Sequence, residues 1–220
     1  MTGRGPILRT LHQHWDRVVE QLYEISAKAA DVLLASALVI ALLKFKQFSR
    51  TERWYVYYAM FVFCINMLLY IKFKGTHEYL YPIYIAGEFF LLASIYIRKL
   101  AVQKLFIIPI IIVSLLFLSI SHIIPDYEDD YSKAVSNLAV VTLIACSMIY
   151  DLRKDSLKSK FTILDAVIFL YYTVSIFIFI LQHQLIPYNP EHFYVIWSIN
   201  NMLLVGLYFT ILYTFIKLKK

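Results

Sequence analysis

The chain has little of the chemistry that builds disulfide scaffolds or zinc domains. It has two cysteines, Cys64 and Cys146, and both lie in apolar segments, where a packed thiol is commoner than a disulfide. No CxxC pair and no Cys/His cluster of the zinc type occurs. The cysteines therefore give no indication of a redox compartment.

Several signatures of enzymes and cofactor proteins are also missing. The last apolar segment has no lysine before Lys217, which excludes a retinal Schiff base in its middle. No GxSxG, phosphate loop or dinucleotide fingerprint is present, and no two histidines have the i, i+4 spacing of a helical metal site. We expect no cofactor, no metal and no nucleic-acid partner, and no motif indicates catalysis.

Apolar residues, by contrast, dominate the composition. Of the 220 residues 60% are hydrophobic and 17% aromatic. A soluble core of this size could not hide so much apolar surface, so lipid must be part of the solvent. The sequence predicts an integral, multi-pass membrane protein with one compact helical domain.

The apolar residues gather in seven segments, each of about the length that a bilayer core requires. Tyrosine and tryptophan mark several of their ends, as expected at lipid headgroups. We therefore predict an all-α bundle of seven transmembrane helices, with spans at about 27–46, 54–71, 80–97, 104–124, 131–150, 161–182 and 193–217.

A segment of different character, residues 1–26, precedes the first span. Its apolar residues recur every three or four positions from Leu8 to Ile25, with charged residues between them, which predicts an amphipathic helix. Three arrangements remain open: a helix in the membrane interface, an extension of the first span, or a packing surface for another subunit. We take the interfacial helix as the expectation and residues 27–220 as the membrane domain.

Lysine and arginine indicate the orientation, because cytoplasmic connections carry an excess of them. Alternate connections and the C-terminal tail share most of these residues: Lys44, Lys46, Arg50, Arg53, Arg98, Lys99, Lys104, Arg153, Lys154, Lys158, Lys160, Lys217, Lys219 and Lys220. Apart from the N-terminal segment, the other side has only Lys72, Lys74 and Lys133. We expect an outer N-terminus, a cytoplasmic C-terminus and a place in the inner membrane.

One acid stands in the middle of an apolar run. Glu88 lies in LYPIYIAGEFFLLASIYIRKL, residues 80–100. A charged group at mid-membrane depth costs about 2.5 to 3.5 kcal/mol on insertion scales, and such residues usually serve a function. Tyr81, Tyr84 and Glu88 fall at i, i+3 and i+7, so they share one face of a helix.

Other polar residues fall at central to outer depth in three further spans. Side chains of this kind prefer a bundle interior, either as hydrogen-bonding glue between helices or as ligands. We expect an outward-opening polar cavity without a lysine beside Glu88, and its predicted ligand-binding residues are Glu88, Tyr84, Asn66, Asn200, Asn201 and Trp197. Asn137 falls at a similar depth.

A second acid lies nearer the cytoplasmic side. Asp165 is on one stripe of its span with Tyr172 and Ser175. It fits either a solvated first-turn acid or, together with Glu88, a proton relay.

The segments ending in MLLY, the run LYPIYIAGEFF and the final FYVIWSINNMLLVGLYF resemble a group of small seven-helix bacterial membrane proteins in which an IYxxxEF-like segment recurs. The resemblance extends over nearly the whole chain and rests chiefly on Tyr84, Glu88, Phe89, Asn200 and Asn201. It implies the topology and the emphasis on Glu88, and it implies no activity.

Four functions follow as hypotheses. The first is a non-enzymatic module that binds or senses a small molecule or lipid near Glu88 and acts through a protein partner or as a homo-oligomer. The second is a proton-linked transporter or channel that uses Glu88 and Asp165. A lipid-modifying enzyme and an accessory protein of a defence or envelope system rank below these.

Overall fold

The computed structural model is helical over most of the residues that it describes, which are 6–70, 77–100, 107–124, 129–153, 161–185 and 191–218 for the backbone. Side chains are described for 17–70, 80–100, 107–120, 123–124, 129–153, 161–182 and 193–218. No β-strand occurs in these ranges. The helices are α1 (Pro6–Leu43), η1 (Phe45–Gln47), α2 (Arg53–Tyr70), α3 (His77–Lys99), α4 (Ile107–Ile123), α5 (Asp129–Arg153), α6 (Thr162–Leu185) and α7 (Glu191–Lys217).

The seven α-helices lie at the seven predicted segments, so the all-α expectation is confirmed for the described residues. Within the described residues, five helices are long and apolar enough to cross a membrane: Arg17–Leu43, Leu80–Lys99, Asp129–Arg153, Thr162–Gln182 and Phe193–Lys217. The apolar part of α4, Ile107–Ile120, is shorter. The crossing of the membrane by α2 and α4 stays a prediction.

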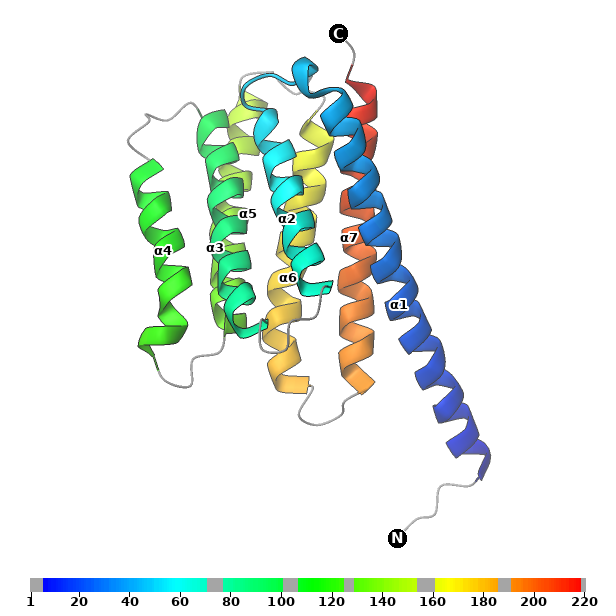
Figure 1. Ribbon diagram of the computed structural model, residues 1–220. Helices are drawn as coiled ribbons and strands as arrows, with labels where there is room; N and C mark the ends of the chain where they lie inside the picture. The colour runs from blue at the N-terminus through cyan, green and yellow to red at the C-terminus, as the bar shows by residue number, and fades with distance from the viewer. Residues whose placement is uncertain are drawn as a thin grey trace.

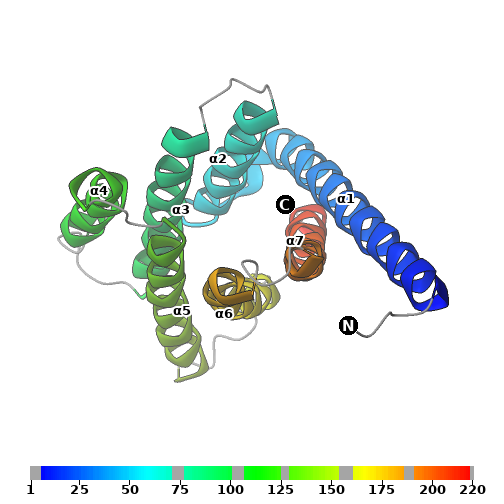
Figure 2. The same ribbon diagram turned by 90° about the horizontal axis from the view of Figure 1, so that it is seen from below.

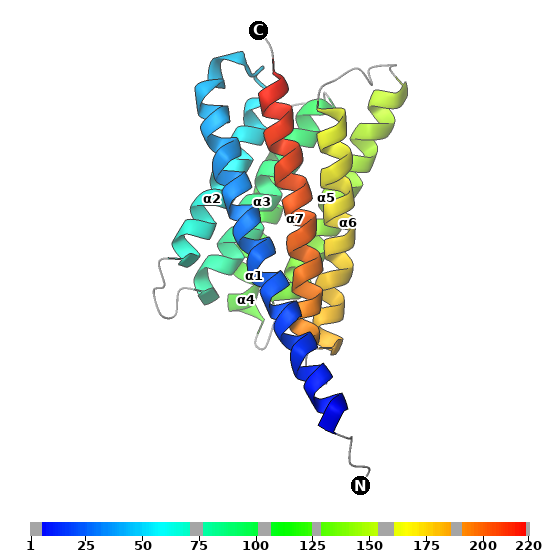
Figure 3. The ribbon, with the colours of Figure 1, turned by 90° about the vertical axis from the view of Figure 1, so that its right-hand side faces the viewer.

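The first helix differs in extent from the predicted first span. α1 runs without a break through 38 residues, so the amphipathic segment and the first span belong to one helix. Its N-terminal end projects beyond the other helices (Figures 1 and 3). A location of residues 6–26 in the membrane interface stays a prediction.

Six of the helices form a closed ring. α1 packs on α2, α2 on α3, α3 on α5, α5 on α6, α6 on α7, and α7 returns to α1 along much of its length. α4 lies outside this ring against α3, as the view along the bundle shows (Figure 2). The ring encloses an interior that is lined by side chains from helices far apart in the sequence.

The two termini lie at opposite ends of the bundle (Figure 1). Helices α1, α3, α5 and α7 end where α2 and α6 begin, so the described lysines and arginines at these helix termini share one end of the molecule. We call this the basic end, defined by Lys44, Arg53, Arg98, Lys99, Arg153 and Lys217.

The basic end holds α1 and α7 together. The Lys44 ammonium donates hydrogen bonds to the carbonyl oxygens of Ile216, at 2.5 Å, and Leu218, at 3.0 Å. These carbonyls belong to the last turn of α7, which no further helical N–H can satisfy. Beside them Phe48 packs edge-on against Phe215 at 5.0 Å between ring centres.

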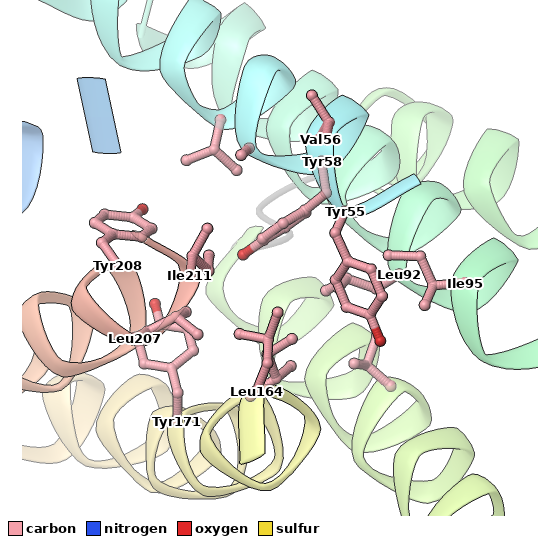
Figure 4. Close-up of a cluster of buried hydrophobic side chains, with 14 of the residues drawn as sticks. Tyr55, Val56, Tyr58, Leu92, Ile95, Leu164, Tyr171, Leu207, Tyr208 and Ile211 are labelled. Atoms are coloured by element: carbon pink, nitrogen blue, oxygen red, sulfur yellow. The ribbon is translucent and has the colours of Figure 1, made fainter. Parts of the chain in front are cut away.

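Aromatic and aliphatic side chains fill the core. Figure 4 shows Tyr58 from α2, Tyr171 from α6 and Tyr208 from α7 directed into the same interior. All three are buried, with exposed fractions of 4% or less. The interior is therefore rich in hydroxyl groups as well as rings, and a buried hydroxyl needs a hydrogen-bond partner.

The outer surface is apolar. Large hydrophobic side chains are exposed on the ring helices and on α4, for example Val39, Leu116, Phe177 and Phe209, each exposed over more than half of its surface. Contact of such an apolar surface with water would cost free energy, whereas contact with the equally apolar lipid chains would not.

Candidate functional site

An ion pair between α3 and α5 lies inside the ring. Glu88 occupies the middle of α3, and Lys133 follows one turn after the start of α5. The Lys133 ammonium contacts the Glu88 carboxylate through Oε2, and the two side chains are only 1% and 2% exposed. Since neither charge reaches water, each depends on the other for compensation.

Two tyrosines complete the surroundings of the carboxylate. The hydroxyls of Tyr84 and Tyr172 donate to Glu88 Oε1 at 2.8 and 2.6 Å. Tyr84 comes from the preceding turn of α3, whereas Tyr172 comes from α6. The Tyr172 hydroxyl also lies 3.0 Å from that of Tyr58 on α2, so four helices meet in one polar cluster.

The same tyrosines surround the lysine. Lys133 Nζ lies 4.6 Å from the ring centre of Tyr84 and 5.5 Å from that of Tyr172. Aromatic faces attract cations at such distances, and the attraction grows when water is excluded. The ammonium is therefore held by one carboxylate and two rings.

This position of Lys133 corrects the sequence-based expectation, which placed Lys133 in an outer connection and no lysine beside Glu88. Lys133 already fell within the predicted span 131–150, and the structure buries it together with its neighbours Ser132, Ser136 and Asn137. It therefore belongs to the interior of the bundle and not to a connection. The buried acid supplied the signal that could have identified Lys133: a carboxylate at mid-membrane depth requires a cation at the same depth.

A second buried ion pair lies toward the basic end. Asp165, in the first turn of α6, contacts the ammonium of Lys99, the last residue of α3. Their side chains are 5% and 15% exposed. The Tyr55 and Tyr96 hydroxyls donate to Asp165 Oδ1, the latter at 3.2 Å, so this acid is more than a solvated first-turn residue.

The second pair repeats the composition of the first. Lys99 Nζ lies 5.3 and 5.7 Å from the ring centres of Tyr55 and Tyr96. In both places, one carboxylate and two tyrosine rings hold one ammonium group. The sequence pattern pointed to Asp165, whereas Lys99 entered only the argument about orientation, as one of the cytoplasmic cations.

Helix α3 connects the two pairs. Glu88 and Lys99 are eleven residues apart, which is about three helical turns, so they share one face about 16 Å apart. Their charges are opposite, and so are those of their partners, Lys133 on α5 and Asp165 on α6. Any rotation of α3 would disturb both pairs together.

At the end opposite the basic end, a further polar group borders the interior. Asp130 accepts a hydrogen bond from the Tyr81 hydroxyl at 2.8 Å and one from the Gln182 amide. Tyr81 stacks on Tyr84, with 6.3 Å between ring centres, and Tyr84 bonds Glu88. The polar residues thus extend from the start of α5 to the middle of the bundle.

The six predicted ligand-binding residues are not all brought together. Glu88 and Tyr84 share the central cluster, but the Asn66 amide donates to Asp31 on α1 at 3.3 Å. The Asn201 amide points to the backbone oxygen of Tyr23, also on α1, at 3.4 Å. Because α1 packs against both α2 and α7, polar groups on those faces serve helix contacts instead of the Glu88 site.

The two remaining predicted residues lie on α7 near α6. The Trp197 ring packs edge-on against Phe179 at 6.0 Å. Asn200 is 3% exposed and lies within hydrogen-bonding reach of the Tyr171 hydroxyl. Neither contacts Glu88 through a recorded hydrogen bond, and an outward-opening cavity around these residues stays a prediction.

The arrangement can hold and move protons. A carboxylate and a lysine in contact share a proton between two bases, and the tyrosine hydroxyls beside them both donate and accept. Such groups inside a membrane are typical of proton relays and of substrate pathways. Among the described residues, no three of His, Cys, Asp and Glu gather as metal ligands.

The fold and the site define a class: an all-helical chain whose long, apolar helices have the character of membrane spans, with charged pairs inside. Comparison with protein-family models, curated proteins and solved structures finds no match. The resemblance to small seven-helix bacterial membrane proteins stays an expectation. The function must therefore be argued from the site itself.

Proposed function

We propose that this protein is a proton-linked transporter or channel of the cytoplasmic membrane, in which Glu88 and Asp165 exchange protons. The observation that carries the proposal is the buried Glu88–Lys133 pair, 2% and 1% exposed, inside a ring of apolar helices. A charge pair at this depth is costly to keep, and a relay is one of the few functions that require it.

The hydrogen bonds of Glu88 favour a relay over ligand binding. Its carboxylate already receives donors from Lys133, Tyr84 and Tyr172 and is only 2% exposed, which leaves a ligand little access to it. A proton needs no space. Protonation of Glu88 would leave the Lys133 ammonium without its counter-charge, which favours release of the lysine's proton to water and leaves both groups neutral.

The tyrosines of α2 support a connection between the two pairs. Tyr58 bonds the Tyr172 hydroxyl near Glu88, and Tyr55, one turn earlier on the same helix, bonds Asp165. Their spacing of three residues places both on the inward face of α2, where both are buried. In this proposal a proton passes along this face through the tyrosine hydroxyls and bridging water.

The distribution of basic residues supports the orientation that we propose. With seven crossings, the N-terminus is outside and the basic end is cytoplasmic, in agreement with the positive-inside rule. The Glu88–Lys133 pair then lies at central to outer depth, and the Asp165–Lys99 pair lies toward the cytoplasm. The two pairs would be the outer and inner stations of the relay.

Reconstitution of the full chain in liposomes with an entrapped pH dye tests the proposal. Under an imposed pH gradient we expect proton flux with the wild-type chain and loss of it in Glu88→Gln. Because that change leaves Lys133 buried and unpaired, the double variant Glu88→Gln/Lys133→Met, which removes both charges, is measured beside it.

Glu24→Gln is the matched control, because Glu24 is an exposed residue that pairs with Lys28 on the surface of α1. It should conduct as the wild type does. Absence of flux in the wild type, or unchanged flux in a folded double variant, would overturn the proposal.

A second candidate is the ligand-binding or sensing module acting through a partner. It is favoured by buried polar atoms without hydrogen-bond partners among the described residues, in particular Oδ1 of Asn137 and Asn200 and Nε1 of Trp197. A ligand-dependent rise in melting temperature without any proton flux would select this candidate instead.

A further inference from the structure

Two buried amide oxygens near the middle of the bundle lack hydrogen-bond donors. Within the described part of the chain, no donor reaches Asn137 Oδ1 or Asn200 Oδ1. Asn137 is fully buried and Asn200 is 3% exposed. Buried amide oxygens are normally satisfied, so this pair indicates a group that supplies N–H or O–H donors.

The two amides belong to one line of side chains across three helices. The Asn137 amide of α5 donates to the Ser175 hydroxyl of α6 at 3.1 Å. Ser175 and Asn200 of α7 both lie within hydrogen-bonding reach of the Tyr171 hydroxyl. Tyr171 and Ser175 are one turn apart on α6, so the amides approach the same face of that helix from either side.

Two sites of the same composition bind lysine ammonium groups in the interior. At Lys133 and at Lys99, a carboxylate and two tyrosine rings surround the Nζ atom, with ring centres 4.6 to 5.7 Å away. Tyrosine is also the residue beside the two amides. Here the Tyr171 hydroxyl is the group within reach, so the amides and this hydroxyl offer oxygen acceptors, which match a cation that carries N–H donors.

We infer that the interior binds a small ammonium cation between α5, α6 and α7, with the oxygens of Asn137 and Asn200 accepting its N–H groups. The inference names the transported species and in that respect rests on the proposed transport function. The site itself is identified by the unpartnered oxygens and the tyrosine beside them.

The position of the site also explains coupling to protons. Asn137 lies one turn after Lys133 on the same face of α5, and both are buried. A cation held at the amide oxygens would repel the Lys133 ammonium, in buried surroundings that screen charge poorly. Binding of one cation would therefore drive release of one proton from the Glu88–Lys133 pair, which keeps the interior charge constant.

Binding to the full chain in detergent tests the inference, with melting temperature and calorimetry as readouts. Methylammonium, with three N–H donors, should bind saturably, whereas tetramethylammonium, with none, and potassium should not. Asn137→Leu and Asn200→Leu each remove one acceptor and should weaken methylammonium binding about tenfold or more. Asn66→Leu is the matched control, since Asn66 bonds Asp31 away from the site, and it should leave binding unchanged.

No stabilisation of the wild type by methylammonium, or equal stabilisation by tetramethylammonium or potassium, would overturn the inference without any variant having to fold. The inference would also be overturned if Asn66→Leu lost methylammonium binding to the same extent as Asn137→Leu and Asn200→Leu. Proton flux that depends on Glu88, without methylammonium binding, would overturn this inference alone. Binding without flux would overturn the proposed transport function and keep the site.

Discussion

At the scale of single residues, the central fact is that two lysines reach two carboxylates inside the bundle. Lys133 pairs with Glu88 and Lys99 with Asp165, and tyrosines surround each pair. A lysine side chain is long, so a position near the end of a helix does not fix where its charge lies. The positive-inside count treats such lysines as surface charges, and here that is wrong for Lys133.

Lys133→Met should destabilise the protein by about 3 to 5 kcal/mol, because it leaves Glu88 buried without a counter-charge. Adding Glu88→Gln in the same chain should restore much of that loss, since the second change removes the orphaned charge. Unfolding in detergent, followed by circular dichroism across the double-mutant cycle, measures both values.

Lys28→Met provides the comparison for this cycle. Lys28 pairs with Glu24 one turn away on α1, but the two side chains are 77% and 57% exposed. Loss of such a pair costs about 0.5 kcal/mol or less. If Lys133→Met were as mild as Lys28→Met, the buried pair would not exist in the folded protein.

At the scale of helices, close approach positions the central acid. Gly87 precedes Glu88 on α3, and a Cβ atom there would overlap the ring of Phe61 on α2. Glycine thus lets α2 and α3 pack closely on one side of the acid, as small residues do between membrane helices.

Gly87→Ala should therefore destabilise the protein by about 1 to 3 kcal/mol through overpacking, unless the Phe61 ring turns aside. Gly206→Ala on α7 is the matched control, because no atom lies within 4 Å of a Cβ placed there. Alanine should be neutral or stabilising at that position, given its higher helix propensity. Melting temperatures of the two variants measure the difference, and equal effects would contradict the close packing of α2 against α3.

At the scale of the whole molecule, the ring brings helices together that are remote in sequence. α7 closes on α1, and α3 packs against α5 as well as against α4, which follows it in the chain. Spans that follow each other in the chain are therefore not always neighbours in the bundle. This explains why Asn201 on α7 meets α1, and why Lys133 on α5 meets Glu88 on α3.

The correction at Lys133 strengthens the orientation that we propose, because it removes one cation from the outer side. We expect a green fluorescent reporter fused after Lys220 to fluoresce in the cytoplasm. Alkaline phosphatase fused after residue 74 should be active outside, because that connection would be external. The reverse pattern of activities would invert the topology and exchange the outer and inner stations.

The sequence by itself located the seven apolar helices of the described residues, because apolar periodicity and length depend on local residues alone. It did not determine that the N-terminal amphipathic segment continues the first of them as one helix. It also identified Glu88, Tyr84 and Asp165, since a carboxylate in an apolar run is conspicuous wherever the chain folds. Only the tertiary structure decided their partners. Lys133, Tyr172 and Lys99 come from other helices, and which faces meet depends on how seven similar apolar helices pack around one another.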